Sequence, residues 1–255
     1  MEIPDDHAVD PRRLAAALAE AVTASGGELR TGVNVEELLV SGGRVQGVRV
    51  WGGERFRAGC VVVSAGPWSA GLSGLPQHAV IPSRPIKGQI LFMRDPEGPG
   101  LLSRVIRMQP GYLVPRGDGR YVLGATMEER GFDTTVTAAA VHDLLRDAIE
   151  LVPGVREFVI DELVAGIRPG SPDNTPLVGP GAVDGLLWAT GHHRHGILLA
   201  PVTAEIVAEL LAPSRAGRTG ALGAELIRAL DPGRFAPGRH DGDRGATGRQ
   251  RVGVG

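Results

Sequence analysis

The sequence predicts an α/β fold in which a domain built on antiparallel sheet interrupts a domain with buried parallel strands. The apolar run 61–63 ends in Ser-Ala-Gly. A fully apolar strand with such an end is typical of the centre of a parallel sheet. The run 186–189 breaks at Thr190-Gly191 and leads into a helix near Gly196. Between these two parts, residues 78–165 contain several strand patterns joined by tight turns, which favours antiparallel sheet.

Local patterns place the helices. A helix is expected from Pro11 to about Ser25, because Asp10 is a suitable N-cap and proline is favoured in the first turn. Its apolar residues recur every four positions and are expected to be buried, namely Leu14, Leu18 and Val22. Further helices are predicted at 137–151, with Thr137 as N-cap, at 196–212 and, over one or two turns, at 225–230.

Strands are predicted where apolar and β-branched residues lie between glycine or proline signals. They are expected at 28–31, 33–40, 44–50, 54–57, 61–64, 84–93, 103–108, 111–116, 120–126, 157–167 and 186–189. The predicted domain division assigns 1–77 and 169–212 to the α/β domain and 78–168 to the inserted domain. Residues 213–255 are expected to form a largely disordered tail.

Composition excludes several functional classes. The 255 residues include 27 basic and 29 acidic side chains, so neither a nucleic-acid partner nor a membrane partner is expected. The one cysteine, Cys60, lies in an apolar run and is expected to be buried rather than nucleophilic. The first residues lack a secretory pattern, and the helix at 196–212 carries Glu205 and Glu209. We therefore expect a soluble, cytoplasmic protein.

One arginine and one glycine turn are candidate site features. Arg168 follows an apolar strand and precedes Pro-Gly, which is expected to stop strand pairing and leave the guanidinium facing a cleft. The turn 191–196 joins a buried strand to a helix, and the N–H groups at a helix start attract an anion or a cofactor edge. Each feature alone is also compatible with a surface ion pair or an ordinary turn.

Eight motifs occur in order over residues 9 to about 212. They are Val9-Asp-Pro-Arg-Arg-Leu14, Val62-Val-Ser-Ala-Gly-Pro-Trp-Ser69, Arg84-Pro-Ile-Lys-Gly-Gln89, Tyr112-Leu-Val-Pro-Arg116, Gly124-Ala-Thr-Met127, Gly131-Phe-Asp-Thr-Thr135, Gly166-Ile-Arg-Pro-Gly-Ser171 and Gly191-His-His-Arg-His-Gly-Ile-Leu-Leu-Ala-Pro201. With them the chain resembles the FAD-dependent amine oxidoreductases of the D-amino acid oxidase superfamily, and within it the glycine oxidases of thiamine biosynthesis. The resemblance implies an incomplete FAD-binding domain of the glutathione-reductase-like type with an inserted antiparallel-sheet substrate domain.

The resemblance also implies an activity. It is the oxidative deamination of glycine or a similar small amine, with FAD as hydride acceptor and molecular oxygen as final oxidant, giving glyoxylate, ammonia and hydrogen peroxide. The partners implied are the small amino-acid substrate and oxygen, and a homo-oligomer is left open. A related D-amino acid or sarcosine oxidase, a dehydrogenase, and a non-catalytic fragment are the alternatives.

Four residues match substrate-binding positions of the family. Arg168 matches the arginine that binds the amino-acid carboxylate, for which a guanidinium offers two parallel donors. Tyr112 matches a tyrosine whose hydroxyl reaches the same carboxylate. Met127 matches a wall of the substrate pocket, and Arg194 a second arginine beside flavin and substrate. No side-chain base is nominated, so no residue is assigned a catalytic role.

The cofactor contacts implied are mostly backbone contacts. They involve Val35, Ala65, Gly66, Gly191, His192, His193, Arg194, His195, Gly196, Ile197 and Leu198. His193 and His195 stand where the family usually has an aromatic residue and an asparagine. A metal site is not expected in this histidine run, because no acidic residue or cysteine lies beside it.

One family feature is missing from the sequence. Family members begin with a strand, the motif Gly-x-Gly-x-x-Gly, a helix and then an acidic residue, which together hold the ADP half of FAD. No such stretch occurs here; Gly179-Pro-Gly181 lacks the strand-to-helix context. We therefore expect the chain to be a truncated version of a longer flavoenzyme.

Overall fold

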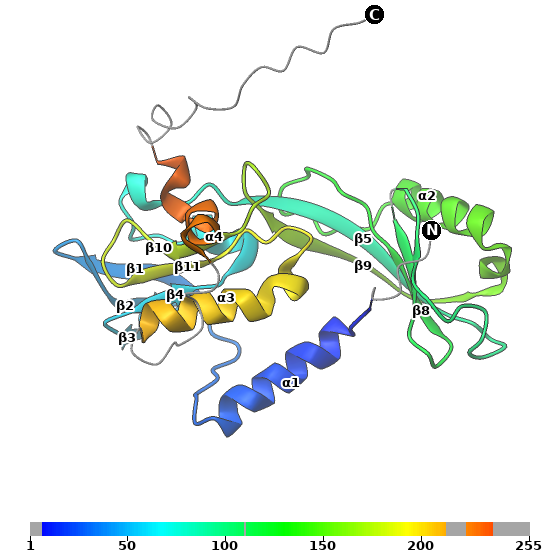
Figure 1. Cartoon of the computed structure of the whole chain (residues 1–255), viewed down its shortest axis with the longest axis horizontal. Coiled ribbons are helices and arrows are strands. Elements are labelled where there is room, and N and C mark those ends of the chain that lie inside the picture. The colour runs from blue at the N-terminus through cyan, green and yellow to red at the C-terminus, as the bar shows by residue number, and fades with distance from the viewer. Residues whose placement is uncertain (1–6, 110, 213–222, 237–255) are drawn as a thin grey trace, which may run out of the picture. The chain divides into compact units, whose positions relative to one another are not determined.

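The computed structural model describes residues 7–109, 111–212 and 223–236 (Figure 1). These described residues divide into two compact units, the first within 1–33 and 85–169 and the second within 34–84 and 170–255. The described residues form helices together with parallel and antiparallel sheet, so the predicted α/β class is confirmed. The predicted domain limits at 77 and 168 stay predictions.

The first unit is built on a five-stranded sheet with the order β6-β7-β8-β5-β9. Its strands are β5 (Arg84–Arg94), β6 (Ile106–Arg107), β7 (Tyr112–Pro115), β8 (Arg120–Gly124) and β9 (Val159–Gly170). β5, β7 and β8 pair antiparallel, as predicted, and β9 forms one edge.

The two faces of this sheet differ in what covers them. Leu91, Leu113 and Leu123 pack against Leu144 and Ala148 of α2 (Ala138–Leu151). Thr137 caps this helix, because its hydroxyl accepts a hydrogen bond from the Ala140 N–H at 3.3 Å. Since side chains alternate along a strand, the neighbours of Leu91 in β5 belong to the opposite face, which α2 leaves open.

Helix α1 (Pro11–Ala24) begins over this opposite face. Asp10 caps the helix as predicted, accepting from the Arg12 and Arg13 N–H groups. The guanidinium of Arg12 lies 4.4 Å from the ring centroid of Phe92 and forms two 2.9 Å hydrogen bonds with Glu162 of β9. The expected buried stripe is wrong, because Leu18 and Val22 are 55% and 46% exposed. Arg12, which makes these contacts with the sheet, lies in the first turn of α1. Leu18 and Val22 lie in later turns and remain exposed.

The second unit contains two three-stranded sheets. β1 (Val35–Ser41), β2 (Arg44–Val50) and β3 (Arg55–Arg57) form an antiparallel meander, in which the predicted 44–57 hairpin is confirmed. The other sheet has the order β10-β11-β4, with β10 (Leu177–Pro180), β11 (Leu186–Thr190) and β4 (Val61–Val63). β11 and β4 are parallel, which confirms the predicted parallel part.

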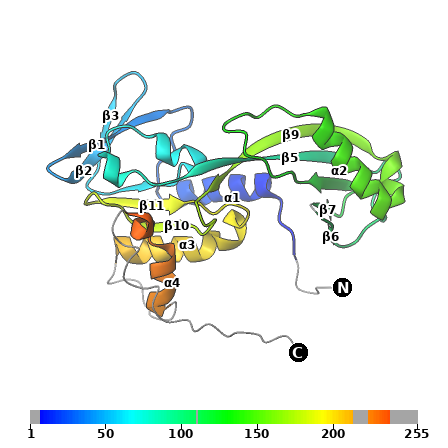
Figure 2. The same ribbon diagram turned by 90° about the horizontal axis from the view of Figure 1, so that it is seen from above.

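The core of the second unit lies on both faces of the β10-β11-β4 sheet. Leu177 and Trp188 pack with Leu38 and Val45 of the meander. Val178 packs on the other side with α3 (Gly196–Leu211) and α4 (Gly223–Leu230). Figure 2 shows the two helices on one side of β10 and β11 and the meander on the other.

Three further expectations differ from the structure. Residues 28–31 form no strand, and Cys60 is exposed rather than buried. Arg168 and Pro169 lie inside β9, which continues to Gly170, so the proline does not end the strand. Of the predicted tail, 213–222 and 237–255 lie outside the described residues, whereas α4 and a 3-10 turn, η5 (Pro232–Phe235), occupy 223–235. No helix in the described ranges is long and apolar enough to cross a membrane.

The turn η5 is tied to the loop before β10 by an ion pair. The Arg234 guanidinium donates to both carboxylate oxygens of Asp173, at 3.0 and 3.1 Å, and to the carbonyls of Thr175 and Pro176. Partial burial opposes ionisation of Asp173, but hydrogen bonds from Arg234, Thr175 and Ser171 outweigh it and lower its pKa to about 2.

Replacing Asp173 by Asn should therefore cost stability in a pH-dependent way. A lowered folded-state pKa stabilises the fold above the unfolded value near 4, and this contribution fades as pH falls toward 2. We expect a loss of about 1 kcal/mol at pH 7, less than the shift alone implies because Asp173 is 43% exposed. Urea unfolding of both proteins at pH 7 and pH 3 measures it; a difference that is the same at both pH values contradicts this assignment.

Candidate functional site

Arg168 lies on β9 with its guanidinium held against the neighbouring strands. Its Nη1 donates to the carbonyl of Thr126 at 3.1 Å and to the carbonyl of Lys87 at 3.4 Å. The side chain is half-buried. A guanidinium carries five N–H donors in a planar fork, so it can hold backbone carbonyls and a carboxylate together.

Tyr112 lies over the same face of the sheet as Arg168. It opens β7 opposite Gly124 of β8, which in turn lies opposite Ile90 of β5, so the three residues share one face. The Tyr112 hydroxyl lies 3.4 Å from the place where a Cβ on Gly124 would be. The Arg168 guanidinium covers Gly88, two residues from Ile90 and therefore on that face too. The fold thus brings together two of the predicted substrate-binding residues.

Met127 follows β8 in a segment that continues to pair with β5. The Thr126 N–H donates to the Gln89 carbonyl, and Glu128 and Lys87 exchange N–H···O bonds of 3.0 and 2.8 Å. Met127 stands between them and is 62% exposed. Its neighbour Thr126 supplies the carbonyl that accepts from Arg168, so Met127 lies one residue from this hydrogen bond.

A buried polar network lies on the other face, beneath this segment. Lys87 is fully buried, and its ammonium donates to Asp133 at 2.7 Å. The Gln89 side-chain amide donates to Glu128 at 2.8 Å and its oxygen accepts from the Thr137 N–H at 2.8 Å. The hydrogen bond from Lys87, with others from Thr135, holds the pKa of Asp133 well below its usual value. The network holds β5 in place from the face opposite Arg168. Sequence reasoning missed it, although two polar residues in an apolar strand were a usable signal.

Removing the partner of Lys87 should destabilise the fold, because it leaves a buried ammonium beside a neutral group. We expect Asp133→Asn to lower the unfolding midpoint by roughly 5 °C in a thermal scan. Asp118→Asn is the matched control, since it breaks a pair with Arg120 in which both side chains are half exposed, and it should shift the midpoint by less than about 2 °C. Equal shifts of the unfolding midpoint in the two variants would contradict the claim that Asp133 compensates a buried charge on Lys87.

The second unit brings together the ends of two parallel strands. The Thr190 hydroxyl at the end of β11 donates to the Gly66 carbonyl beyond the end of β4, at 2.9 Å. Gly66 and Gly191 have φ values of 55° and 77°, which residues with a Cβ rarely adopt. Ala65, which precedes Gly66, is half-buried. Two glycine turns side by side at the carboxyl ends of parallel strands let a ligand approach backbone directly.

The histidine turn leads from these strand ends into α3. His192 is half-buried, with Nε2 2.9 Å from the Thr203 hydroxyl, and burial lowers its pKa. His193 has a φ of 49°, an uncommon backbone for a residue with a side chain. Arg194 and His195 are exposed, and His195 precedes the helix without a side-chain cap.

The first turn of α3 is open. It starts at Gly196, and Ile197 and Leu198 are 48% and 76% exposed. Val35, the remaining predicted contact, begins β1 of the meander and is 36% exposed. Uncapped N–H groups beside exposed apolar side chains fit one edge of a flat, partly apolar, hydrogen-bonding ring system such as a flavin.

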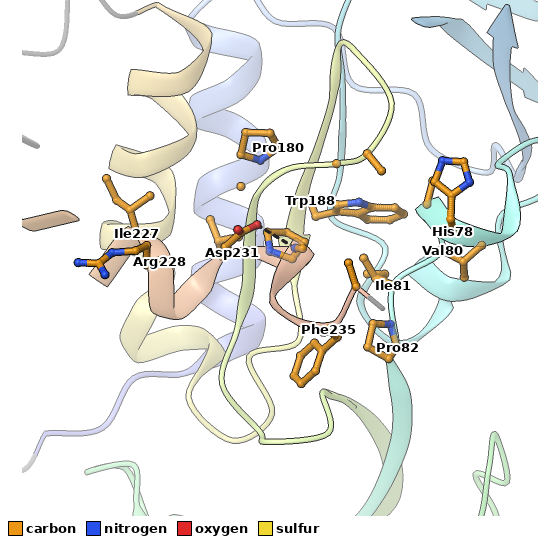
Figure 3. A pocket seen from close by; sticks show the side chains of 18 of the residues that line it. His78, Val80, Ile81, Pro82, Pro180, Trp188, Ile227, Arg228, Asp231 and Phe235 are labelled. Carbon is orange, nitrogen blue, oxygen red and sulfur yellow. Dashed lines mark hydrogen bonds between the residues drawn. The ribbon is translucent and has the colours of Figure 1, made fainter. Parts of the chain in front are cut away.

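A cavity of about 1010 Å³ lies elsewhere in the second unit. Figure 3 shows it between the segment with His78 and Val80 and the α4 side chains of Ile227 and Arg228. Trp188 also contributes to its wall. None of the predicted cofactor contacts lines this cavity.

The comparison with known families decides the affiliation of the chain. Residues 1–210 match the family model described as FAD dependent oxidoreductase (DAO). The chain belongs to this family. The cofactor of the family is FAD, and the glycine turns and the open start of α3 are the described features that fit its flavin end.

Relatives in this family carry several names. The chain is 37% identical over 235 residues to the "Bifunctional protein ThiO/ThiG" of Synechocystis, covering 91% of this chain and 34% of that protein. It is 36% identical to "Hydrogen cyanide synthase subunit HcnC" of Pseudomonas aeruginosa, covering 83% and 50%. The crystal structure of glycine oxidase from Geobacillus kaustophilus is similar with a TM-score of 0.70 and 33% identity, covering 80% and 57%. The chain therefore spans between about a third and three fifths of the length of these relatives.

A metal centre has no support in the described part of the chain. No group of three or more His, Cys, Asp or Glu side chains there lies close enough to hold a metal ion. In particular, the histidine turn at 191–196 is part of no such group.

Proposed function

We propose that the protein carries out the FAD-dependent oxidation of glycine or a similar small amine, giving glyoxylate, ammonia and hydrogen peroxide when glycine is the substrate. The observation that carries the proposal is the placement of Arg168 and Tyr112 over one face of the sheet of the first unit. The names of its relatives, which include glycine oxidases, support the substrate class. A product that feeds thiamine thiazole synthesis, molecular oxygen as oxidant and a cytoplasmic location belong to the same proposal.

In this function Arg168 and Tyr112 act on the substrate carboxylate. The arginine fork donates two parallel N–H bonds, and the phenol adds a third donor. Met127 borders the carbon end of a small substrate, and Arg194 lies in the turn assigned to the flavin. FAD supplies the hydride acceptor when bound, so the side chains orient the substrate rather than abstract a proton.

In the second unit, Ala65, Gly66 and residues 191–198 would hold the flavin end of the cofactor through backbone. Gly66 and Gly191 allow close approach, and the N–H groups of the first turn of α3 meet polar ring atoms. Val35 is proposed on the adenine side. The sequence holds no Gly-x-Gly-x-x-Gly stretch for the pyrophosphate, so no described residue is assigned to it.

The chain is nearly as similar to a hydrogen cyanide synthase subunit as to the ThiO/ThiG protein, so its relatives carry names of different activities. The second candidate function is a dehydrogenase that passes electrons to an acceptor other than oxygen. The visible absorption spectrum of the purified chain tests cofactor binding first. Oxygen consumption with glycine, compared with reduction of an artificial electron acceptor, then separates oxidase from dehydrogenase. A colourless chain that oxidises no amine with added FAD contradicts both and favours a non-catalytic fragment.

Arg168 and Tyr112 together are called the carboxylate clamp. Arg168→Ala should raise the KM for glycine with a smaller effect on kcat, because the clamp binds the carboxylate in the ground state as well as in the transition state. Loss of a charge-assisted bond costs about 1.5–3 kcal/mol, which corresponds to roughly 10- to 150-fold in KM. Arg94→Ala is the control, since Arg94 pairs with Asp161 at the far end of β5. Steady-state kinetics of both variants measure the effect; an unchanged KM in Arg168→Ala removes Arg168 from the clamp.

A further inference from the structure

The guanidinium of Arg168 occupies the space where a side chain at position 88 would begin. A Cβ built on Gly88 would lie 2.3 Å from both Nη1 and Nη2 of Arg168 and 2.5 Å from Cζ. Contacts this short do not occur between non-bonded atoms. The fork therefore lies against the backbone of β5, in a space that is free only because residue 88 is glycine.

The backbone conformation of Gly88 does not itself require glycine. Its φ lies outside the left-handed region, whereas many glycines of this chain have positive φ values. Gly88 is also buried in the middle of β5, where a glycine weakens a strand and often marks a close approach by another group. The close approach here is made by the side chain of Arg168.

The hydrogen bonds of Arg168 depend on this contact. Nη1 reaches the carbonyls of Thr126 and Lys87 only because the fork lies between β5 and the segment after β8. The backbone around Gly88 is held from the opposite face by the pairs Lys87–Asp133 and Gln89–Glu128. The two residues that flank Gly88 are thus fixed, so the backbone of β5 beneath the guanidinium cannot easily shift to make room for a side chain at position 88.

We propose that Gly88 is the positioning residue for the carboxylate clamp: its missing side chain lets Arg168 lie against β5 at the height needed to meet a small carboxylate beside Tyr112. The inference rests on the proposed role of Arg168 in substrate binding. Any side chain at position 88 lifts the fork from the sheet and breaks its bond to Thr126. The substrates that fit this geometry are α-amino acids whose carboxylate reaches the Arg168 guanidinium at the surface of β5.

The chain offers a matched control on the strand that carries Arg168. Gly166 lies two residues before Arg168 in β9, on the same face, and a Cβ there would meet nothing within 4 Å. Gly88→Ala and Gly166→Ala thus add the same methyl group to the same face, but only the first meets the guanidinium. Gly124→Ala is unsuitable, because its Cβ would also lie 2.5 Å from the Ile90 side chain.

The direct test is a crystal structure of Gly88→Ala beside those of Gly166→Ala and the unchanged chain. The added methyl group meets the flexible end of Arg168, so we expect Gly88→Ala to fold and to melt close to the unchanged chain. Its guanidinium should have left hydrogen-bonding distance of the Thr126 carbonyl, whereas Gly166→Ala should keep that bond. A guanidinium that stays in place in Gly88→Ala overturns the proposal, whether or not the chain oxidises amines.

Kinetics in a double-mutant cycle separate positioning from a general loss of structure. Gly88→Ala should raise the KM for glycine about tenfold or more while kcat changes less, and Gly166→Ala should leave both unchanged. In the Arg168→Ala background, Gly88→Ala should add little, because the group it displaces is gone. If Arg168→Ala raises KM and Gly88→Ala does not, the positioning role fails and the proposed function stands. If neither changes KM, the clamp in the proposed function fails, and the crystal structures alone decide the position of the fork.

Discussion

The contact of the Arg168 guanidinium with the backbone of β5 is the constraint around which the first unit is organised. It requires a glycine at 88, a carbonyl from Thr126 and a β5 strand that does not move. The last requirement is met on the other face of the sheet, where Lys87 is buried with Asp133 and the leucines of β5, β7 and β8 pack on α2. One face thus supplies rigidity and the other supplies polar groups, and the alternation of side chains along a strand keeps the two tasks apart.

The proposed cofactor contacts of the second unit differ in kind from the side-chain contacts of the first. Its proposed contacts are backbone N–H groups at glycine turns, made possible by the parallel pairing of β4 with β11 and by the hydrogen bond from Thr190 to Gly66. Backbone contacts tolerate changes of side chain. This explains how histidines can stand at 193 and 195 without disturbing the start of α3.

Local patterns predicted the helix caps at Asp10 and Thr137 and the antiparallel strands, because these depend on residues a few positions apart. The family resemblance supplied the roles proposed for Arg168 and Tyr112. Neither could predict that β9 continues through Pro169, which an edge strand tolerates because a missing N–H there costs no ladder bond. The burial of Lys87 also depends on a partner 46 residues away. Leu18 and Val22 were predicted to be buried and are exposed. A helical apolar stripe shows which residues can be buried, but it does not show that another element covers them.

The central claim is that Arg168 and Tyr112 form a carboxylate site on the face of the first sheet opposite α2. The most direct measurement is a crystal structure of the chain with acetate, which has the carboxylate of the proposed substrate and no amine to oxidise. The account predicts both acetate oxygens within hydrogen-bonding distance of the Arg168 fork, one of them also reaching the Tyr112 hydroxyl, with Arg168 still bonded to Thr126. Acetate that binds elsewhere, or a saturated crystal in which no carboxylate meets Arg168, would contradict it.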